Sequence, residues 1–455
     1  MPHVDRSLLA VVGGTFTLRF STGLTGGLLL YYLASLGDLP GGRPVGAFEV
    51  GLLTALYFLA ELVLSPGFGI LSDRVGTYPI MQLGPIFGAV AVVMTALTTD
   101  LLLLGVTRWI EGAAAAASVP SILGYIAVAT SHDEGLRGKT VARFEAATLA
   151  GLGGGVVAAG GLFALMGRNA FFVNAAIYLL SLLIYRYGVG NAVGNPVESE
   201  RPAAESERAA AGGVAELAHE RFDVGRYARI LRTPGVWLLA PTWIAVNAFV
   251  GVWTSQSIFQ LVQKPRPGFE AQLLMGGFAP LQVSIGLAVW LLVFFAGLLY
   301  WGNRFKRFRR TTIIAIGIVG GLVQQGALYA LNHSADSGIA AQVGLAVVAA
   351  AGLFVLAGAT PAALGLLADI SESHPSDRGA IMGLYSVFLA LGQISGSLIG
   401  GGAAQWAGID GLLAAGVGML LVALLPVRAL RSNEHLVGVR AEAMAPPGGR
   451  SAESA

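Results

Sequence analysis

Five charged residues lie inside otherwise apolar stretches of this sequence: Arg19, Glu61, Arg108, Glu111 and Glu145. A charge removed from water is unfavourable unless it is paired, so charged residues in such places are candidates for function. A carboxylate beside an arginine can take up or release a proton when its surroundings change. The three glutamates are therefore predicted proton-coupling residues, and the two arginines are predicted to line a cavity or contact a substrate.

The spacing of these charges predicts two pairs. Arg108 and Glu111 are three residues apart and share a helix face. Arg19 and Glu61 each lie roughly 12–16 Å from the same end of their helices, at 1.5 Å per residue, and can meet at one depth. Two interpretations stay open, because each pair is either a fixed neutral unit or a titrating one. Glu145 lies nearer a helix end, where we expect a gate contact with Arg137 or Arg143.

The second half of the chain offers neutral chemistry instead. Trp253 and Gln256 share one face of an apolar stretch that also contains Asn247, and Gln393 lies in a later stretch. Amides and aromatic rings suit a broad, partly apolar substrate, so these four residues are predicted to face a cavity. The alternative is that the amides bond between helices and the tryptophans lie at the membrane interface.

The stretches that carry these residues are long enough to cross a membrane. Hydrophobic residues make up 55% of the chain and charged residues 12%, against about 25% charged residues in soluble proteins. A spanning helix needs about 20 mostly apolar residues. Twelve such stretches occur, at about 8–36, 47–70, 80–99, 101–130, 138–165, 168–188, 235–262, 274–302, 311–332, 337–368, 378–406 and 409–430.

These stretches predict an all-α membrane protein with twelve transmembrane helices in two pseudo-symmetric six-helix bundles. The predicted bundles cover residues 1–188 and 233–431, with a cytoplasmic linker at 189–232 and a disordered cytoplasmic tail at 432–455. With the N-terminus inside the cell, only four of the 28 Lys and Arg residues fall in outer loops: Arg43, Arg168, Lys264 and Arg266. This bias predicts a plasma-membrane protein with both termini in the cytoplasm.

An internal repeat supports the division into two bundles. Arg137-Gly138 and Arg378-Gly379 each precede an apolar stretch, and the second pair lies 241 positions after the first. Glycines recur at the same offset, and residues four apart lie on one helix face. Such stripes permit close packing between helices. The predicted packing glycines are Gly151, Gly155, Gly392, Gly396 and Gly400.

Residues 69–76, after the second stretch, read Gly-Ile-Leu-Ser-Asp-Arg-Val-Gly. This segment resembles the Gly-x-Leu-x-Asp-Arg-x-Gly signature of the major facilitator superfamily, and Arg108-x-x-x-Gly112 resembles a second element of that family. Gly69 and Gly76 permit a sharp turn. The resemblance implies that Asp73 meets the start of the eleventh helix and locks one conformation. It therefore implies a gate made of Asp73 and Arg74, with Arg137 and Arg378 near it.

The resemblance implies a secondary active transporter that works by alternating access, similar to bacterial multidrug and solute efflux members. We expect proton-coupled export of small hydrophobic compounds. The alternatives are a proton-coupled importer of a small organic solute, or a non-transporting lipid- or pigment-handling assembly factor. The expected partners are a small-molecule substrate, protons and membrane lipids, and the expected state is a monomer.

Other classes of protein fit the sequence poorly. The chain has no cysteine, its six histidines are not spaced as metal ligands, and its net charge of +2 suggests no nucleic-acid partner. The sequence contains no catalytic constellation or phosphate-binding loop outside its membrane stretches. We therefore expect no enzyme activity, no metal and no cofactor.

Overall fold

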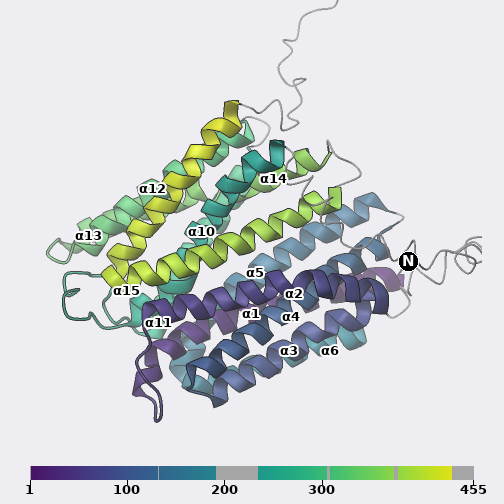
Figure 1. Cartoon of the computed structure of the whole chain (residues 1–455), viewed down its shortest axis with the longest axis horizontal. Helices are drawn as coiled ribbons and strands as arrows, with labels where there is room; N and C mark the ends of the chain where they lie inside the picture. The colour runs from purple at the N-terminus through teal and green to yellow at the C-terminus, as the bar shows by residue number, and fades with distance from the viewer. Residues whose placement is uncertain (1, 132, 191–233, 305–307, 373–377, 433–455) are drawn as a thin grey trace, which may run out of the picture.

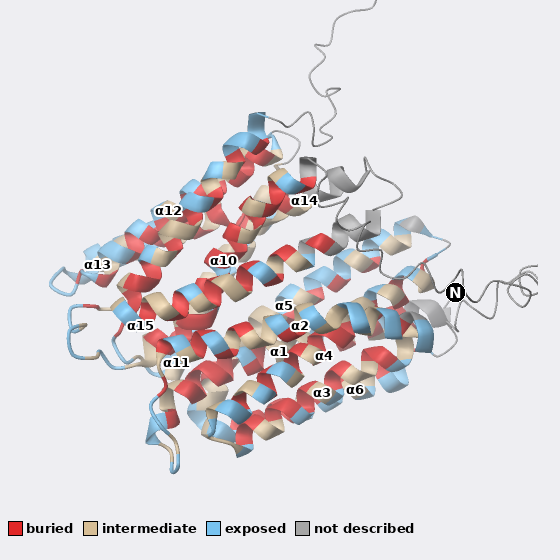
Figure 2. Cartoon of the chain, viewed as in Figure 1, coloured by how far each residue is buried: buried red, intermediate tan, exposed pale blue. Residues whose placement is uncertain are grey.

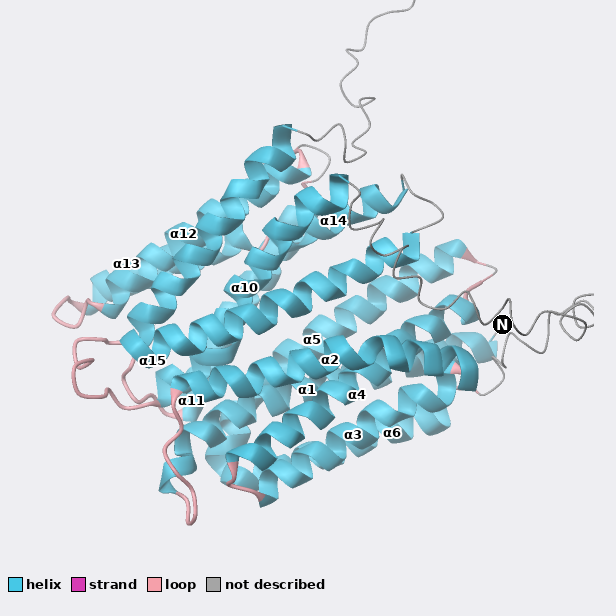
Figure 3. Cartoon of the chain, viewed as in Figure 1, coloured by secondary structure: helices cyan, strands magenta, loops and turns pink. Residues whose placement is uncertain are grey.

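The computed structural model describes residues 2–131, 133–190, 234–304, 308–372 and 378–432. Within these ranges some side chains, including those of Asp73 and Arg378, lie outside the description. Helices connected by loops make up the described chain, and Figure 3 shows no strand in that part of it. The all-α prediction is confirmed.

The first bundle consists of six long helices. They are α1 (Pro2–Ser35), α2 (Ala47–Val75), α3 (Thr77–Leu97), α4 (Leu101–Ala129), α5 (Glu134–Met166) and α6 (Ala170–Leu183). Short helices η1 (Leu36–Asp38) and η2 (Gly167–Asn169) lie in turns, and the π-helix η3 (Ile184–Gly188) extends α6.

The second bundle repeats this arrangement with one helix broken and two joined. Its elements are α10 (Pro234–Val262), α11 (Pro280–Gly302), α12 (Arg310–Asn332), α13 (Ile339–Leu356), α14 (Ala359–Glu372) and α15 (Arg378–Ser432). The helices α13 and α14 form one span, and α15 contains two, because its backbone is not helical at Ala407 and Gly408.

The described helices contain twelve membrane spans. In the described residues, ten apolar helical segments are long enough to cross a membrane, and two of them, 135–188 and 386–432, each contain two spans. Large apolar side chains such as Leu292, Val347 and Leu425 are more than 60% exposed, which suits a surface that faces lipid. Figure 2 shows buried residues along the inner faces of the helices in both bundles.

The turns between the fifth and sixth spans of the two halves have the same backbone conformation and lie at equivalent positions of the sequence repeat. Gly167 (φ 55°, ψ −135°) ends α5, and Gly408 (φ 61°, ψ −138°) divides α15. They lie 241 positions apart, the offset of the sequence repeat. This region of φ and ψ is open to glycine and disfavoured for other residues. The repeat therefore extends to the turns between the fifth and sixth spans of each half.

The predicted packing glycines lie where helix backbones cross. A Cβ atom added at Gly155 would lie 2.1 Å from a carbonyl oxygen of α1, and one at Gly151 would lie 2.7 Å from another. A Cβ atom at Gly396 would lie 2.0 Å from a carbonyl oxygen of α10, and Gly392 and Gly400 also contact α10 closely. The pairs α1–α5 and α10–α15 are therefore equivalent crossings in the two bundles.

The eighth span begins later than predicted. Residues 274–279 are apolar but form a loop, and α11 starts at Pro280. The amide of Leu274 donates to Asn332 Oδ1 (2.9 Å), and the amide of Phe278 donates to Leu261 O (3.0 Å). Hydrogen bonds to the second bundle hold this partly exposed run as a loop, so hydrophobicity alone misplaced the helix start.

The predicted domain boundaries remain predictions. Residues 191–233, which contain nearly all of the predicted linker, lie outside the described residues, as do residues 433–455 of the predicted tail.

The two bundles contact each other near the end that carries loops 36–46 and 263–279. There Gln256 Nε2 donates to Ala47 O (2.9 Å), and Tyr31 Oη donates to Pro280 O (3.2 Å). Gly160 N donates to Ser284 Oγ (2.9 Å). Figure 1 shows the bundles spread apart toward the end marked N. We call the end that carries these contacts the closed end, and the end toward which the helices spread the open end.

Candidate functional site

Arg108 and Glu111 form a buried ion pair in the first bundle. Both side chains are at most 4% exposed, and Arg108 Nη1 contacts Glu111 Oε2. Helix α2 lies directly against this turn of α4, because a Cβ atom at Gly112 would be 2.3 Å from Tyr57 O and 3.1 Å from Glu61 N. The glycine of the Arg-x-x-x-Gly element therefore allows two charged helices to approach each other.

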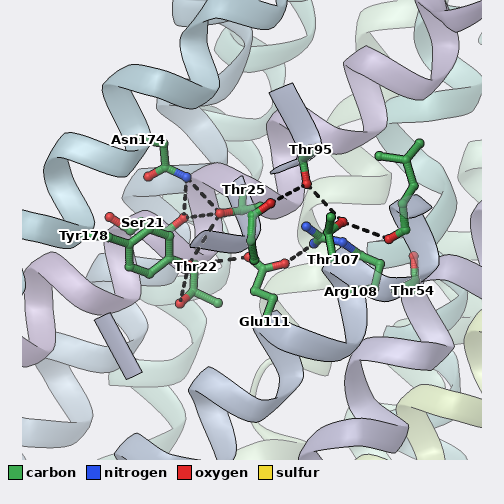
Figure 4. Close-up of polar contacts among 12 residues, drawn as sticks. Ser21, Thr22, Thr25, Thr54, Thr95, Thr107, Arg108, Glu111, Asn174 and Tyr178 are labelled. Carbon is green, nitrogen blue, oxygen red and sulfur yellow. Dashed lines mark hydrogen bonds and ion pairs between the residues drawn. The ribbon is translucent and has the colours of Figure 1, made fainter. Parts of the chain in front are cut away.

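A network of hydroxyl and amide groups surrounds the Glu111 carboxylate. Tyr178 Oη on α6 donates to Glu111 Oε1 (3.4 Å). Asn174 Nδ2 donates to Thr25 Oγ1 (2.8 Å), and Thr25 Oγ1 donates to Ser21 O (2.8 Å). Figure 4 shows these side chains gathered around Glu111, with Thr95 and Thr107 on the Arg108 side. The network joins α1, α4 and α6.

Two guanidinium nitrogens of Arg108 have no partner in the described part of the chain. They are Nε and Nη2, and both are fully buried. A buried donor without an acceptor is unfavourable, by about 1–3 kcal/mol or more for a charged group. This edge of Arg108 therefore requires water or an acceptor that arrives in another conformation.

A second charged group lies beside the first. Arg19 on α1 and Glu61 on α2 are half-buried, and Glu145 on α5 is exposed. The charge of Arg19 acts on both carboxylates. One arginine cannot fully neutralise two carboxylates, so this group can carry a net negative charge that a proton or a cation would offset.

Tyr57 connects the two charged groups. It lies one turn before Glu61 on α2, and its phenol is within range of the charges of Glu61, Arg19 and Glu111. The five charges singled out from the sequence are therefore gathered in one region of the first bundle. Two layers make up this region: Arg19, Glu61 and Glu145 are accessible, whereas Arg108 and Glu111 are buried.

The candidates in the second bundle are more scattered. Asn247 Nδ2 donates to Trp243 O (2.9 Å) in its own helix, and Gln393 Oε1 accepts from Thr254 Oγ1 (3.2 Å). Gln256 bonds to the first bundle at the closed end. In this conformation its amide joins the bundles and does not line an open space.

Trp253 occupies the most central place among these residues. It is partly buried and packs against three hydrophobic clusters, one of them mainly in the first bundle. Its indole N–H is buried and has no acceptor among the described residues. The side chain therefore presents a free donor at the junction of the bundles.

In the loop motif at residues 69–76, only one of the two glycines lies at the turn. Helix α2 continues through Gly69 to Val75, so the turn depends on Gly76 alone, with φ of 100°. Arg74 is exposed. Arg137 donates to Thr130 Oγ1 and to Ala127 O (3.4 Å each), both near the end of α4. The side chains of Asp73 and Arg378 lie outside the description, so their gating role stays a prediction.

Sequence reasoning missed the neutral half of the buried network. Thr25, Asn174 and Tyr178 are uncharged and occur in ordinary apolar stretches, so composition does not single them out. Asn174 and Tyr178 are four residues apart and share one face of α6, which is the signal that could have found them. Among the described residues, no group of three or more His, Cys, Asp or Glu side chains could hold a metal ion.

The fold, the two-bundle repeat and the charged region agree with a family comparison. The sequence profile of the Major Facilitator Superfamily matches residues 11–279 and 267–449. The chain belongs to this superfamily of membrane transporters.

Similarity to individual proteins is low and covers only part of the chain. A 132-residue segment is 30% identical to "Quinolone resistance protein NorA" of Staphylococcus aureus (strain MRSA252), covering 29% of this chain and 32% of that protein. The protein of the same name from strain COL is 29% identical over the same length. The similarity therefore spans about a third of the length of these relatives.

Structural similarity to a solved transporter extends over nearly the whole chain. The crystal structure of the nucleoside transporter NupG matches with a TM-score of 0.66 at 13% identity, covering 93% of this chain and 98% of that one. At this identity the likeness shows the fold alone.

Proposed function

We propose that the protein is a secondary active transporter that exports small hydrophobic compounds in exchange for protons by alternating access. The observation that carries the proposal is the charged region of the first bundle, in which one arginine serves two carboxylates beside a buried ion pair. The hydrogen bonds described between the two bundles lie toward one end, which supports an alternating mechanism. The segment similar to a quinolone resistance protein favours export as the direction.

Proton coupling follows from the accessible layer of this region. When Glu61 and Glu145 are both ionised, Arg19 offsets only one of the two negative charges. A proton that enters from the open end neutralises the other. Closing that end and opening the opposite one changes the hydration of the same carboxylates, which favours release on the other side. Glu145, the exposed member, is the first carboxylate that a proton from the open end reaches.

The second bundle supplies an apolar wall for the substrate. Trp253 presents its ring and a free N–H, and Trp290 on α11 packs against the same two clusters of the second bundle. An aromatic surface with few hydrogen-bonding groups binds compounds of varied shape. With the open end facing the cytoplasm of the cell, as the Lys and Arg distribution indicates, the protein accepts its substrate from the inside and works as a monomer in the plasma membrane.

Replacing one coupling carboxylate is expected to separate transport from the proton gradient. In proteoliposomes with an imposed pH gradient, Glu61→Gln, Glu111→Gln and Glu145→Gln each remove a group that can release a proton. At least one variant should lose gradient-driven accumulation and keep downhill movement of the compound. Glu49→Gln is the matched control, because Glu49 forms a partly exposed pair with Arg43 (2.5 Å) that contributes at most about 1 kcal/mol.

The outcomes of this assay separate the alternatives. If all three variants accumulate substrate like the unmodified protein, the coupling residues are wrongly assigned. If the compound moves in the direction opposite to the proposed one, the protein is an importer. If no compound moves in any condition and a stable partner copurifies, the assembly-factor interpretation replaces transport.

The closed end can be tested by cross-linking, because the chain has no cysteine of its own. A Cβ atom at Gly46 would lie 2.6 Å from Gln405 Oε1 on the other bundle. Oxidation of Gly46→Cys/Gln405→Cys should form a disulfide in most molecules and reduce transport at least tenfold, and reduction should restore it. Gly46→Cys/Trp406→Cys is the control, since Trp406 is 85% exposed. Full transport by the cross-linked protein would contradict alternating access.

A further inference from the structure

The Tyr178 ring lies in a notch in the neighbouring helix. A Cβ atom at Gly88 of α3 would lie 2.4 Å from Tyr178 Cε1 and 2.6 Å from its Cζ, so only glycine leaves room for the ring. Tyr178 is 1% exposed. Helix α6 packs against α1 and α3, and through this notch its phenol reaches Glu111 on α4.

The phenol has one proton and three acceptors within reach. Tyr178 Oη lies 3.4 Å from Glu111 Oε1 and 3.5 Å from each of the hydroxyl oxygens of Thr22 and Thr25. Thr22 and Thr25 already donate to carbonyl oxygens of α1, at 3.0 and 2.8 Å, so towards Tyr178 they act as acceptors. The phenol therefore bonds either to α4 or to α1.

The charge of Glu111 decides between these two bonds. An ionised carboxylate accepts a charge-assisted hydrogen bond, which is about twice as strong as one between neutral groups. A protonated Glu111 loses that advantage, and the phenol is then free to donate to the α1 hydroxyls. The proton on Glu111 thus exchanges an α6–α4 bond for an α6–α1 bond.

We propose that Tyr178 is a positioning residue that transmits the protonation state of Glu111 to α1. The proposal rests on the proposed proton coupling and adds the element that responds to the proton. Helix α1 carries Arg19 one turn before Thr22, and it contacts the second bundle through Tyr31. A change in the hydrogen bonding between α6 and α1 therefore affects Arg19 in the accessible charged layer and the contact of Tyr31 with the second bundle.

The surroundings of Glu111 contain few other groups that titrate. They are Arg108 on its own helix, Tyr57 on α2 and Tyr178 on α6, with Glu61 and Arg19 beyond Tyr57. Helix α3 contributes Gly88 at this level and no charge. The α1 side consists of the Thr22 and Thr25 hydroxyls.

The test follows the protonation of Glu111 directly in the purified full-length protein. Infrared absorption of the protonated carboxyl group is recorded against pH, and the Glu111 band is identified by its loss in Glu111→Gln. Tyr178→Phe removes the donor that favours the ionised form, so the midpoint should move about one pH unit toward alkaline values. The pH profile of proteoliposome transport should move in the same direction.

A second variant predicts the opposite sign and guards against misfolding of the first. Thr22→Val removes one competing acceptor on α1, so Tyr178 stays with Glu111 and the midpoint should move toward acid values. Tyr185→Phe is the matched control: Tyr185 is equally buried in a notch at Gly14, and its hydroxyl lies 3.4 Å from Thr15 Oγ1. This control should leave the Glu111 midpoint unchanged.

The possible results separate the two proposals. An unchanged midpoint in Tyr178→Phe, or an equal shift in Tyr185→Phe, overturns the role of Tyr178 whatever the protein transports. Shifts of opposite sign in Tyr178→Phe and Thr22→Val support that role even if no transport is found. In that case only the proposed function fails.

Discussion

Gly155→Ala and Gly396→Ala are each expected to destabilise the folded protein strongly. The added Cβ atoms would lie 2.1 Å from Phe20 O and 2.0 Å from Ala248 O, inside the contact distance of backbone atoms. Overpacking a tight interior costs about 1–3 kcal/mol, and rigid backbone atoms place these two sites at or above the upper limit. Thermal unfolding of the detergent-purified protein and the monodisperse fraction in size-exclusion chromatography would measure the loss.

Each of these glycines has a matched control in its own helix. Gly154 faces only the Phe20 ring at 3.5 Å, and Gly402 has no atom within 4 Å of an added Cβ, so alanine should be tolerated at both. Serine already occupies position 395, which corresponds to Gly154 in the repeat. Equal losses in the controls and the test variants would mean that the α1–α5 and α10–α15 crossings do not explain the effect, since alanine has a higher helix propensity than glycine.

Apolar length was sufficient to predict the spans because each spanning helix must satisfy its own backbone in lipid. Two features needed three-dimensional information. The loop at 274–279 is as apolar as a helix, but two of its amides bond to Asn332 and Leu261. The turns at Gly167 and Gly408 are visible only as positive φ angles, although the offset between them was available in the sequence.

The candidate site was predictable where charge revealed it. A charged side chain in an apolar stretch is conspicuous. The sequence alone was therefore enough to find Arg19, Glu61, Arg108, Glu111 and Glu145. Neutral groups do not stand out in this way. The sequence could not predict that Tyr178 reaches Glu111, because that contact requires Gly88 on a different helix. Nor could it predict that Gln256 bonds across the bundles at the closed end.

The sequence spacing left open whether Arg108 and Glu111 form a fixed neutral pair or a pair in which Glu111 titrates. Arg108→Gln leaves Glu111 as a buried charge without its partner, a change that typically costs about 3–5 kcal/mol. Glu111→Gln leaves Arg108 with the same problem, added to the two nitrogens that already lack partners. Each single variant should therefore unfold at a clearly lower temperature than the unmodified protein.

The double variant Arg108→Gln/Glu111→Gln decides between the two interpretations. It contains no buried charge at this site, and a buried pair replaced as a unit is often neutral for stability, so most of the lost stability should return. A fixed pair contributes nothing beyond neutrality, and the double variant would then still accumulate substrate against a gradient. A titrating Glu111 predicts a stable protein that moves substrate only downhill. Unfolding temperature and gradient-driven accumulation, measured on the same preparation, therefore separate structural neutralisation from proton coupling.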